Sequence, residues 1–250
     1  MNQEAKWLLS EKYGGAESEA FRADLKRLAE GEPLAYVIGH VPFLDCQIHL
    51  DSHPLIPRPE TEYWALKAIL SIRMDSRSVR VLDLCAGSGC IGVAVAKAIP
   101  EAQVTFGEID PSHLPTIEAN LKINLNQNQT FHSNERFEVV QSDLFENIKG
   151  KFDFILTNPP YIDPTIDRAE KSVKDYEPHL ALYGGHDGLE IIYSIIDDSI
   201  NFLAPQGQLW IEHEPEQAEE ILKLAGGAGY ARATTFPDQY GVLRYSVLVK

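Results

Sequence analysis

The stretch VLDLCAGSGCIG, residues 81–92, decides the fold because it joins an apolar strand to a helix through a glycine turn. Asp83 lies near the end of the strand, and Gly87 and Gly89 make the turn. Glycines allow a ligand to approach the backbone closely, and the start of the helix offers free N–H groups. In open α/β sheets, ligands bind at the carboxyl ends of the strands. The turn therefore indicates either a ligand site or a tight strand–helix connection without a ligand.

The sequence around this turn alternates between strand-like and helix-like segments. Strands are predicted at residues 103–109, 137–143, 152–158 and 207–214, and helices at 90–99, 113–124, 187–203 and 215–229. Such alternation is typical of a doubly wound parallel sheet. A short turn joins the final strands, at 231–236 and 244–250, and it allows only an antiparallel pair. We therefore predict an α/β, Rossmann-like fold with a seven-stranded, mostly parallel sheet that has one antiparallel strand.

The composition is that of an ordinary globular protein, with 44% hydrophobic and 24% charged residues. No window approaches about eighteen uninterrupted apolar residues, so no membrane span is expected. The three cysteines form neither a metal-ligand pair nor an even disulfide set, so no metal is expected and a reducing compartment is favoured. The net charge of −15 disfavours non-specific nucleic-acid binding, which depends on Lys and Arg. It favours a protein or small-molecule substrate.

Acidic residues follow two further strands of the predicted sheet. Glu108 ends the second strand, where a carboxylate can accept hydrogen bonds from both hydroxyls of a ribose, and Asp110 is its rival for this role. Asp143 ends the third strand, where it can bind the amine of an adenine, or it is a solvated loop acid or a helix cap. Leu144 or Phe145 would then face the ring. Because the turn lacks the G-x-G-x-x-G pattern, an adenosine ligand without a pyrophosphate is the better match.

Three acids at strand ends around one glycine turn resemble the Rossmann-like, S-adenosylmethionine-dependent methyltransferases. The resemblance implies S-adenosylmethionine as the cofactor. It also implies that the glycine turn faces the methionine part, that Glu108 binds the ribose and that Asp143 reads the adenine. The residues assigned to the cofactor are Asp83, Cys85, Ala86, Gly87, Ser88, Gly89, Glu108, Asp143, Leu144 and Asn158.

The fourth strand ends in Asn158, Pro159, Pro160 and Tyr161, where this fold opens on its ligand crevice. Proline lacks an N–H group and fixes φ, and it pushes the preceding residue out of the helical region, so the segment cannot continue a strand ladder. We expect a rigid arch whose Asn158 oxygen and backbone carbonyls accept hydrogen bonds from an –NH₂ group, with Tyr161 as a flat wall. These four residues are the predicted catalytic residues, and a proline-rich loop without such a role is the alternative.

The arch is suited to activating a planar amine. An amide or aromatic amine is a poor nucleophile because its lone pair is delocalised. Two acceptors that hold its N–H bonds can turn the lone pair towards a sulfonium methyl group, which is catalysis by orientation and electrostatics. The surplus proton becomes acidic only after the nitrogen is methylated, so no strong base is required.

Longer blocks resemble the HemK/PrmC family of protein-glutamine methyltransferases, from about Gly31 to the end of the chain. The blocks are GEPLAYVIGHVPFLDCQIHLDSHPLIPRPETE, LDLCAGSGCIGVAVA, TNPPYI, YEPHLALYGGHDGLE and the pattern D-x-x-G-x-x-R of Asp238, Gly241 and Arg244. The resemblance implies methylation of the glutamine in the Gly-Gly-Gln loop of peptide chain release factors, with its amide held by Asn158 and the Pro159 carbonyl. It also implies that residues 57–62 and 177–178 shape the site. Arg58 is then either part of the site or a structural ion-pair partner.

Two other functions stay open. An exocyclic-amine methyltransferase acting on RNA or DNA would use the same arch and would need a basic groove. A binding module that has lost turnover would keep only the cofactor site. The intact set of Asp83, Gly87, Gly89, Glu108 and Asn158 argues against the binding module.

The chain is predicted to divide into three parts: a short helical segment (1–33), a β-hairpin-like connector (34–57) and a methyltransferase catalytic domain (58–250). Two helices are expected in the first part, with Ser18 as an N-cap, and Pro59 begins the first helix of the third. The expected protein is a monomer without direct nucleic-acid or membrane contact. Members of the resembled family occur in bacterial cytoplasm and in eukaryotic organelles, so a cytoplasmic or mitochondrial location is expected.

Overall fold

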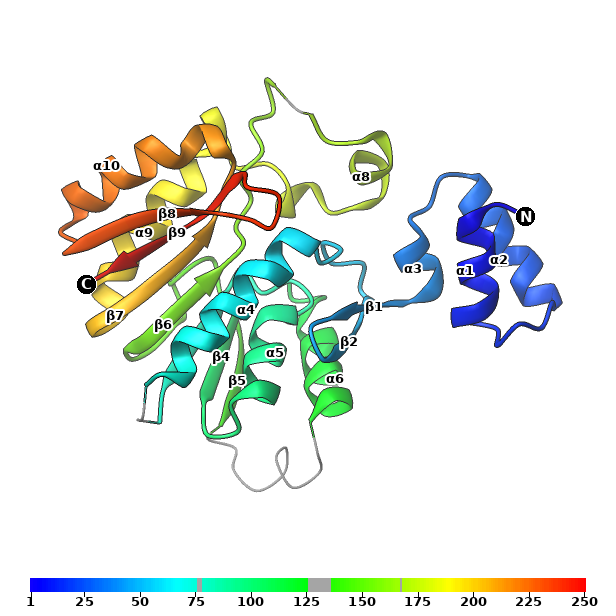
Figure 1. Ribbon diagram of the computed structural model, residues 1–250, viewed down its shortest axis with the longest axis horizontal. Helices are drawn as coiled ribbons and strands as arrows, with labels where there is room; N and C mark the ends of the chain where they lie inside the picture. The colour runs from blue at the N-terminus through cyan, green and yellow to red at the C-terminus, as the bar shows by residue number, and fades with distance from the viewer. Residues whose placement is uncertain (76–77, 126–135, 167) are drawn as a thin grey trace.

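The computed structural model describes residues 1–75, 78–125, 136–166 and 168–250. Within them, one central sheet contains seven strands (Figure 1). Their spatial order is β5 (Phe137–Gln141), β4 (Gln103–Glu108), β3 (Arg80–Leu84), β6 (Phe152–Thr157), β7 (Leu203–Glu212), β9 (Leu243–Val249) and β8 (Arg232–Pro237). β9 is antiparallel to β7 and β8, and the other neighbouring pairs are parallel. The predicted fold class is confirmed.

The strand order reverses between β3 and β6. The chain builds β3, β4 and β5 outward on one side and then crosses to place β6 on the other side of β3. Leu84 pairs with Thr157, so Cys85 and Asn158 are the next residues at the same edge of the sheet. A crevice for a ligand is expected at such a reversal.

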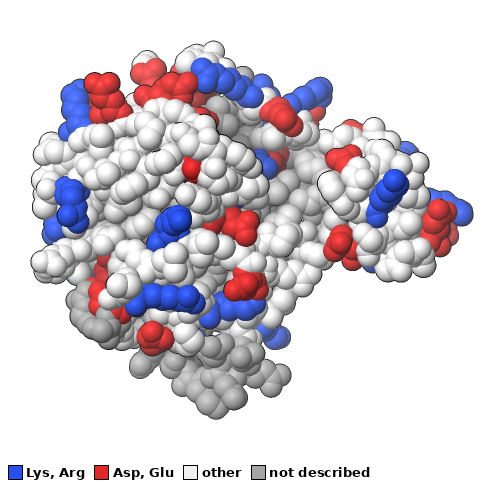
Figure 2. Space-filling view, in the orientation of Figure 1, with Lys and Arg blue, Asp and Glu red and all other residues white. Residues whose placement is uncertain are grey.

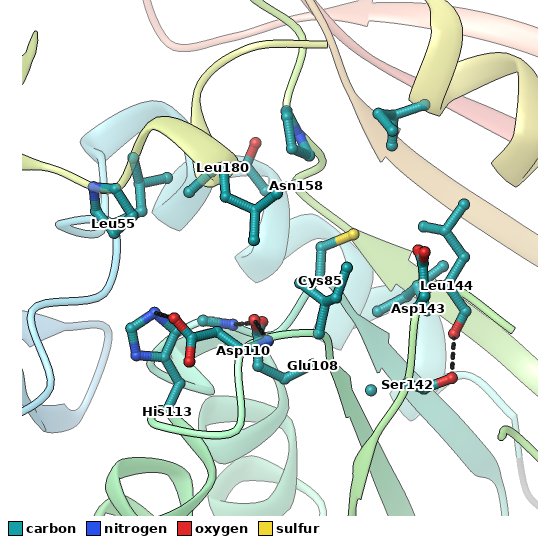
Figure 3. A pocket seen from close by; sticks show the side chains of 18 of the residues that line it. Leu55, Cys85, Glu108, Asp110, His113, Ser142, Asp143, Leu144, Asn158 and Leu180 are labelled. Carbon is teal, nitrogen blue, oxygen red and sulfur yellow. Dashed lines mark hydrogen bonds and ion pairs between the residues drawn. The ribbon is translucent and has the colours of Figure 1, made fainter. Parts of the chain in front are cut away.

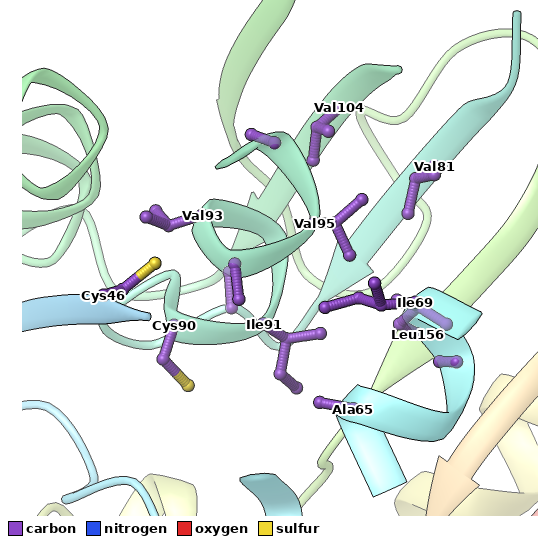
Figure 4. Packing of buried hydrophobic residues seen from close by; sticks show 14 of the residues in the cluster. Cys46, Ala65, Ile69, Val81, Cys90, Ile91, Val93, Val95, Val104 and Leu156 are labelled. Atoms are coloured by element: carbon purple, nitrogen blue, oxygen red, sulfur yellow. The ribbon is translucent and has the colours of Figure 1, made fainter. Parts of the chain in front are cut away.

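Helices cover both faces of the sheet (Figure 1). One face carries α4 (Pro59–Arg73), α5 (Cys90–Ala98) and α6 (Leu114–Asn124), and the other carries α9 (Glu190–Phe202) and α10 (Ala218–Ala228). Neighbouring side chains of β3 alternate between these faces, so Val81 and Leu82 belong to different buried clusters. In Figure 4, Ile91 and Val95 of α5 point towards Ile69 of α4 and the strands. Apolar side chains therefore point to both faces of β3, and this strand lies between two layers of helices.

The N-terminal part forms α1 (Gln3–Glu11) and α2 (Glu19–Ala29), which lie apart from the sheet and far from the C-terminus (Figure 1). Both helices were predicted, and the Ser18 hydroxyl oxygen caps the second by accepting a hydrogen bond from the Phe21 N–H at 3.1 Å. Leu8, Phe21 and Val37 form a small buried cluster of their own. Val37 belongs to the predicted connector, so this cluster crosses the expected boundary between residues 33 and 34, and the division of the chain into three parts stays a proposal.

The connector differs in part from the prediction. The antiparallel hairpin of β1 (His40–Phe43) and β2 (Cys46–His49) is present, but the strand-like residues before it form the short helix α3 (Leu34–Ile38). Pro33 precedes this helix and Gly39 ends it in the left-handed conformation, with a φ of 98°. These two residues favour a helical turn over the local β propensity.

The segment after α9 also differs, because β7 begins at Leu203 and not at the predicted Gly207. Leu203 pairs with Phe152, and the register then shifts before Phe154 pairs with Gln208. Pro205 lies in this irregular part of the strand, because proline has no N–H group to donate to a regular ladder.

The remaining helices are short and lie near the carboxyl edge of the sheet or after β7. They are α8 (Lys171–Tyr176) and the 3₁₀ turns η1 (His179–Ala181), η2 (His186–Gly188) and η3 (Pro215–Gln217). Among the described residues, no helix is long and apolar enough to cross a membrane.

Candidate active site

A cleft opens at the carboxyl ends of β3, β4 and β6 and encloses about 860 Å³, its open mouth included. We call it the cofactor cleft. Its lining includes six of the predicted cofactor residues, namely Cys85, Gly87, Glu108, Asp143, Leu144 and Asn158. In Figure 3, Asn158 and Leu180 lie on the opposite side of the cleft from Glu108 and Asp110. The parallel strands therefore bring together residues that are far apart in the sequence.

Glu108 and its rival Asp110 both line the cofactor cleft. Glu108 is buried, and its carboxylate accepts hydrogen bonds from the N–H groups of Gly87 at 2.8 Å and Asp110 at 2.9 Å. Asp110 is less buried and accepts from the N–H of Ser112 at 2.8 Å. Glu108 is therefore the more firmly held of the two acceptors, and each of its oxygens keeps room for a second hydrogen bond.

Asp83 lies beneath the cleft and does not line it. It is 1% exposed, and its Oδ2 atom accepts a hydrogen bond from the Gly92 N–H at 2.8 Å. Burial raises the pKa of Asp83 to about 8. Asp83 thus anchors the start of α5, so any effect on a cofactor passes through the turn.

The other three residues of the turn, Ala86, Ser88 and Gly89, are also buried and lie outside the cleft lining. The Ser88 carbonyl accepts a hydrogen bond from the fully buried Asn120 side chain at 2.9 Å. The same side chain exchanges hydrogen bonds with the backbone of His49 in the hairpin. The connector therefore helps to hold the glycine turn, which the sequence did not indicate.

Asp143 and Leu144 line the far end of the cleft, and Asp143 is exposed. Phe145 is buried instead and stacks on Phe202 at 4.6 Å between ring centroids, so Leu144 is the better candidate for contact with an adenine. Leu144 and Cys85 have φ angles of 43° and 58°. Non-glycine residues in this left-handed region are uncommon and gather at functional sites.

A second cavity lies against the same arch and is named the amide cavity. Its lining includes Pro159, Tyr161 and Arg58. Asn158 lines both this cavity and the cofactor cleft, and so do Leu55 and Ala181, whereas Pro160 lines the cofactor cleft alone. Asn158 therefore stands where the two spaces meet.

Backbone contacts with the segment 182–188 hold the arch in place. Ile162 donates a hydrogen bond to the Leu182 carbonyl at 2.9 Å, and the Gln217 side chain donates to the Tyr161 carbonyl at 2.9 Å. Gly188 has a φ of 66°, and a Cβ atom at this position would lie 2.0 Å from the Tyr161 carbonyl oxygen. The glycine-rich block YGGHDG was noted in the sequence, but its role in supporting the arch was missed.

Polar side chains beneath the arch were also missed. Asn158 Nδ2 donates to the Thr61 hydroxyl at 3.3 Å, and the Tyr161 hydroxyl donates to Glu212 Oε1 at 3.1 Å. Burial and the nearby Glu212 raise the pKa of Tyr161 well above its ordinary value, so its hydroxyl stays protonated. Glu212 lies inside the predicted strand 207–214, so its position in the sequence did not indicate this contact.

Arg58 both lines the amide cavity and forms an ion pair. Its guanidinium lies 2.6 Å from the buried carboxylate of Glu177, which also accepts a hydrogen bond from the Ile56 N–H at 3.0 Å. Pro178, next to this carboxylate, lines the cofactor cleft. The Glu177 carboxylate thus holds Ile56 and Arg58 beside the segment that lines the cleft. The ion pair of Arg58 is confirmed, and its part in the site stays a prediction.

Beyond Tyr161 the surface is hollowed into a third space, which we call the acidic groove. Five carboxylates and one guanidinium line it, those of Asp163, Asp187, Glu214, Glu216, Glu220 and Arg168. On the face seen in Figure 2, basic side chains stand singly among acidic and uncharged ones. The groove therefore has the wrong charge for a phosphate backbone.

Comparisons with known proteins place this site in a family. The family model described as methyltransferase small domain matches residues 66–174. The release factor glutamine methyltransferase of Bifidobacterium longum is 36% identical over 90% of this chain and 78% of its own length. The chain belongs to the release factor glutamine methyltransferase family. The family's enzyme from Rhodopirellula baltica is 38% identical over 89% of this chain and 75% of its own length.

Solved structures agree with the methyltransferase fold of this family. A methyltransferase from Pyrococcus furiosus gives a TM-score of 0.57 at 16% identity, covering 91% of this chain and 96% of that one. The catalytic domain of hMettl16, solved with the MAT2A 3′UTR hairpin 6, gives 0.61 at 16% identity, covering 82% and 75%. At these identities the likeness concerns the fold alone.

Proposed function

We propose that this protein transfers a methyl group from S-adenosylmethionine to the side-chain amide nitrogen of the glutamine in the Gly-Gly-Gln loop of a peptide chain release factor. The observation that carries the proposal is the position of Asn158, which lines both the cofactor cleft and the amide cavity. A methyl donor in the first and an amide in the second would meet at this residue. The names of the relatives support the choice of a release-factor glutamine.

The residues of the cofactor cleft fit an adenosyl group. The lining of the cleft combines apolar side chains with a few polar groups, as small-molecule sites do. The Glu108 carboxylate is held in place by two backbone N–H groups and suits the two hydroxyls of a ribose. At the far end, Asp143 would accept a hydrogen bond from the adenine amine while Leu144 packs against the ring. When bound, S-adenosylmethionine supplies an electrophilic methyl group on a sulfonium.

In the proposed reaction, the arch orients the amide of the substrate. The Asn158 oxygen and the Pro159 carbonyl would accept hydrogen bonds from the two N–H bonds of the glutamine amide, which turns the nitrogen lone pair towards the methyl carbon. The nitrogen would then take the methyl group that bound S-adenosylmethionine supplies, and the electron pair of the broken carbon–sulfur bond would remain on the sulfur of S-adenosylhomocysteine. The methylated nitrogen carries a positive charge and releases one proton to water.

The alternative, an exocyclic-amine methyltransferase on RNA or DNA, is not favoured. It requires Lys and Arg near the arch to neutralise phosphates. The acidic groove next to Tyr161 has the opposite charge, and the amide cavity adds only the Arg58 guanidinium, which is paired with Glu177. A protein loop as the substrate does not require Lys and Arg near the arch.

The test is incubation with methyl-labelled S-adenosylmethionine and release factor, either wild type or with the loop glutamine replaced by alanine. Label is expected on the wild-type factor alone, and mass spectrometry of the Gly-Gly-Gln peptide should place it on the glutamine. Label that persists on the replaced factor would overturn the choice of residue. Label that enters RNA or DNA and leaves the release factor unmodified would favour the alternative.

A further inference from the structure

Glu212 is a buried carboxylate beside the arch that the steps above leave without a role. It ends β7, and because Thr157 pairs with Ile211, it is the neighbour of Asn158 at the edge of the sheet. It is 1% exposed and lines neither the cofactor cleft nor the amide cavity. Glu212 therefore has no access to a substrate and can act only through other side chains.

Three side chains donate hydrogen bonds to the carboxylate of Glu212. Its Oε2 atom accepts hydrogen bonds from the Thr61 hydroxyl at 2.7 Å and from Trp64 Nε1 at 2.6 Å. Its Oε1 atom accepts from the Tyr161 hydroxyl at 3.1 Å. Burial raises the pKa of Glu212, and these three hydrogen bonds oppose that rise. A carboxylate that is held on both oxygens fixes its neighbours and is not free to take a proton from the substrate.

The direction of these bonds determines which end of the Asn158 amide faces the amide cavity. An indole N–H can only donate, so Oε2 of Glu212 must be an acceptor, and the Thr61 hydroxyl donates its single hydrogen to the same oxygen. The Thr61 oxygen can then only accept from Asn158, so the Asn158 atom facing it, 3.3 Å away, must be the NH₂ nitrogen. The Asn158 oxygen is left free as an acceptor.

We propose that Glu212, acting through Thr61, is the positioning residue that turns the Asn158 oxygen towards the amide of the substrate. If the Asn158 amide were reversed, its NH₂ group would face the –NH₂ group of a glutamine, and two donors cannot form a hydrogen bond. The same carboxylate accepts a hydrogen bond from the Tyr161 hydroxyl. One buried carboxylate therefore positions the polar side chains at both ends of the arch, those of Asn158 and Tyr161. This inference rests on the proposed function, because it concerns how the glutamine amide is held.

Thr61→Val is the decisive variant. Valine has nearly the shape of threonine, but it can neither donate to Glu212 nor accept from Asn158. We expect kcat for release-factor methylation to fall at least tenfold, while the KM and the dissociation constant for S-adenosylmethionine stay within twofold. Thr61→Ser restores the hydroxyl and should recover the rate to within about threefold. Thr235→Val is the matched control, because it removes a hydroxyl that hydrogen-bonds to Ser246 in the antiparallel part of the sheet.

The outcomes separate positioning from mere structural support. A general loss of packing would weaken cofactor binding together with kcat, and Thr61→Ser would not rescue it. A Thr61→Val enzyme with the wild-type kcat overturns the proposal, and so does a Thr61→Ser enzyme as slow as Thr61→Val.

A measurement without turnover tests the orientation of the Asn158 amide separately from the proposed function. In protein labelled with ¹⁵N-asparagine, nuclear Overhauser effects should link the Asn158 NH₂ hydrogens to the Thr61 side chain. Their absence in the wild type, with those hydrogens directed into the cavity, would overturn the proposed orientation. Failure of the wild type to methylate any release factor would instead overturn the proposed function and leave the spectroscopic result to decide the orientation.

Discussion

The Oε2 atom of Glu108 accepts a hydrogen bond from the backbone N–H of Gly87 at 2.8 Å, which ties the end of β4 to the glycine turn after β3. Both residues line the cofactor cleft. The second oxygen of Glu108 accepts from the Asp110 N–H at 2.9 Å. A single carboxylate therefore shapes the turn and lines the cleft, and both of its oxygens take part in this arrangement.

The Glu108→Gln variant should bind S-adenosylhomocysteine about 10- to 100-fold more weakly. A glutamine side chain has one acceptor oxygen, so either the Gly87 or the Asp110 N–H group loses its partner, and hydrogen bonds to a charged group are worth roughly 1.5–3 kcal/mol. Titration calorimetry measures the change. Glu101→Gln is the control, because Glu101 is exposed and precedes β4, at the opposite end of the strand. An affinity within twofold of the wild type would show that Glu108 does not hold the ligand.

The sequence alone was sufficient to predict the residues that line the cleft at the strand ends. Cys85, Glu108, Asp143 and Asn158 each follow a recognisable strand, and parallel strands bring such residues to one edge. The same rule placed Asp83 in the site, where the structure puts it under the turn instead. Side chains alternate between the two faces of a strand. The turn that follows changes their direction by an amount that the local sequence does not show.

The support beneath the arch could not be predicted because its members are far apart in the chain. Asn158 and Thr61 are separated by 97 residues, and Thr61 and Glu212 by 151. Thr61 lies in the first turn of a predicted helix, and Glu212 lies inside the predicted strand 207–214, so neither position indicated a link between them. Only tertiary packing joins them into one hydrogen-bonded chain.

The Asn158→Ala variant should lose methyl transfer while it keeps most of its cofactor affinity. The alanine removes an acceptor for the substrate amide, and loss of one such positioned group typically costs 10²–10³ in kcat, i.e. roughly 3–4 kcal/mol. Single-turnover methylation and calorimetry give the two quantities separately. Asn201→Ala, an exposed change at the end of α9, should behave as the wild type. If cofactor affinity collapses together with transfer, the assignment of Asn158 to the substrate is wrong.

His213 should make the protein less stable as the pH falls below 6.5. Its ring is fully buried, and burial lowers its pKa from 6.5 to about 4. Between these two values the unfolded chain binds a proton that the folded protein does not, so stability rises with pH, by up to about 1.4 kcal/mol per pH unit. The free energy of unfolding of His213→Gln, measured in urea from pH 4 to 7, should lack this slope. Parallel curves for the two proteins would contradict the prediction.

The Gly188→Ala variant should lower methyl transfer at least tenfold by displacing the arch. The new Cβ atom would lie 2.0 Å from the Tyr161 carbonyl oxygen and 2.6 Å from Gln217 Nε2, and the backbone φ of 66° disfavours alanine. The carbonyl and the amide must therefore move apart, which shifts Tyr161 and with it the arch. Gly226→Ala is the matched control, because nothing lies within 4 Å of its Cβ position and alanine favours the helix. A wild-type rate for Gly188→Ala would mean that the arch tolerates displacement and that catalysis does not depend on its rigidity.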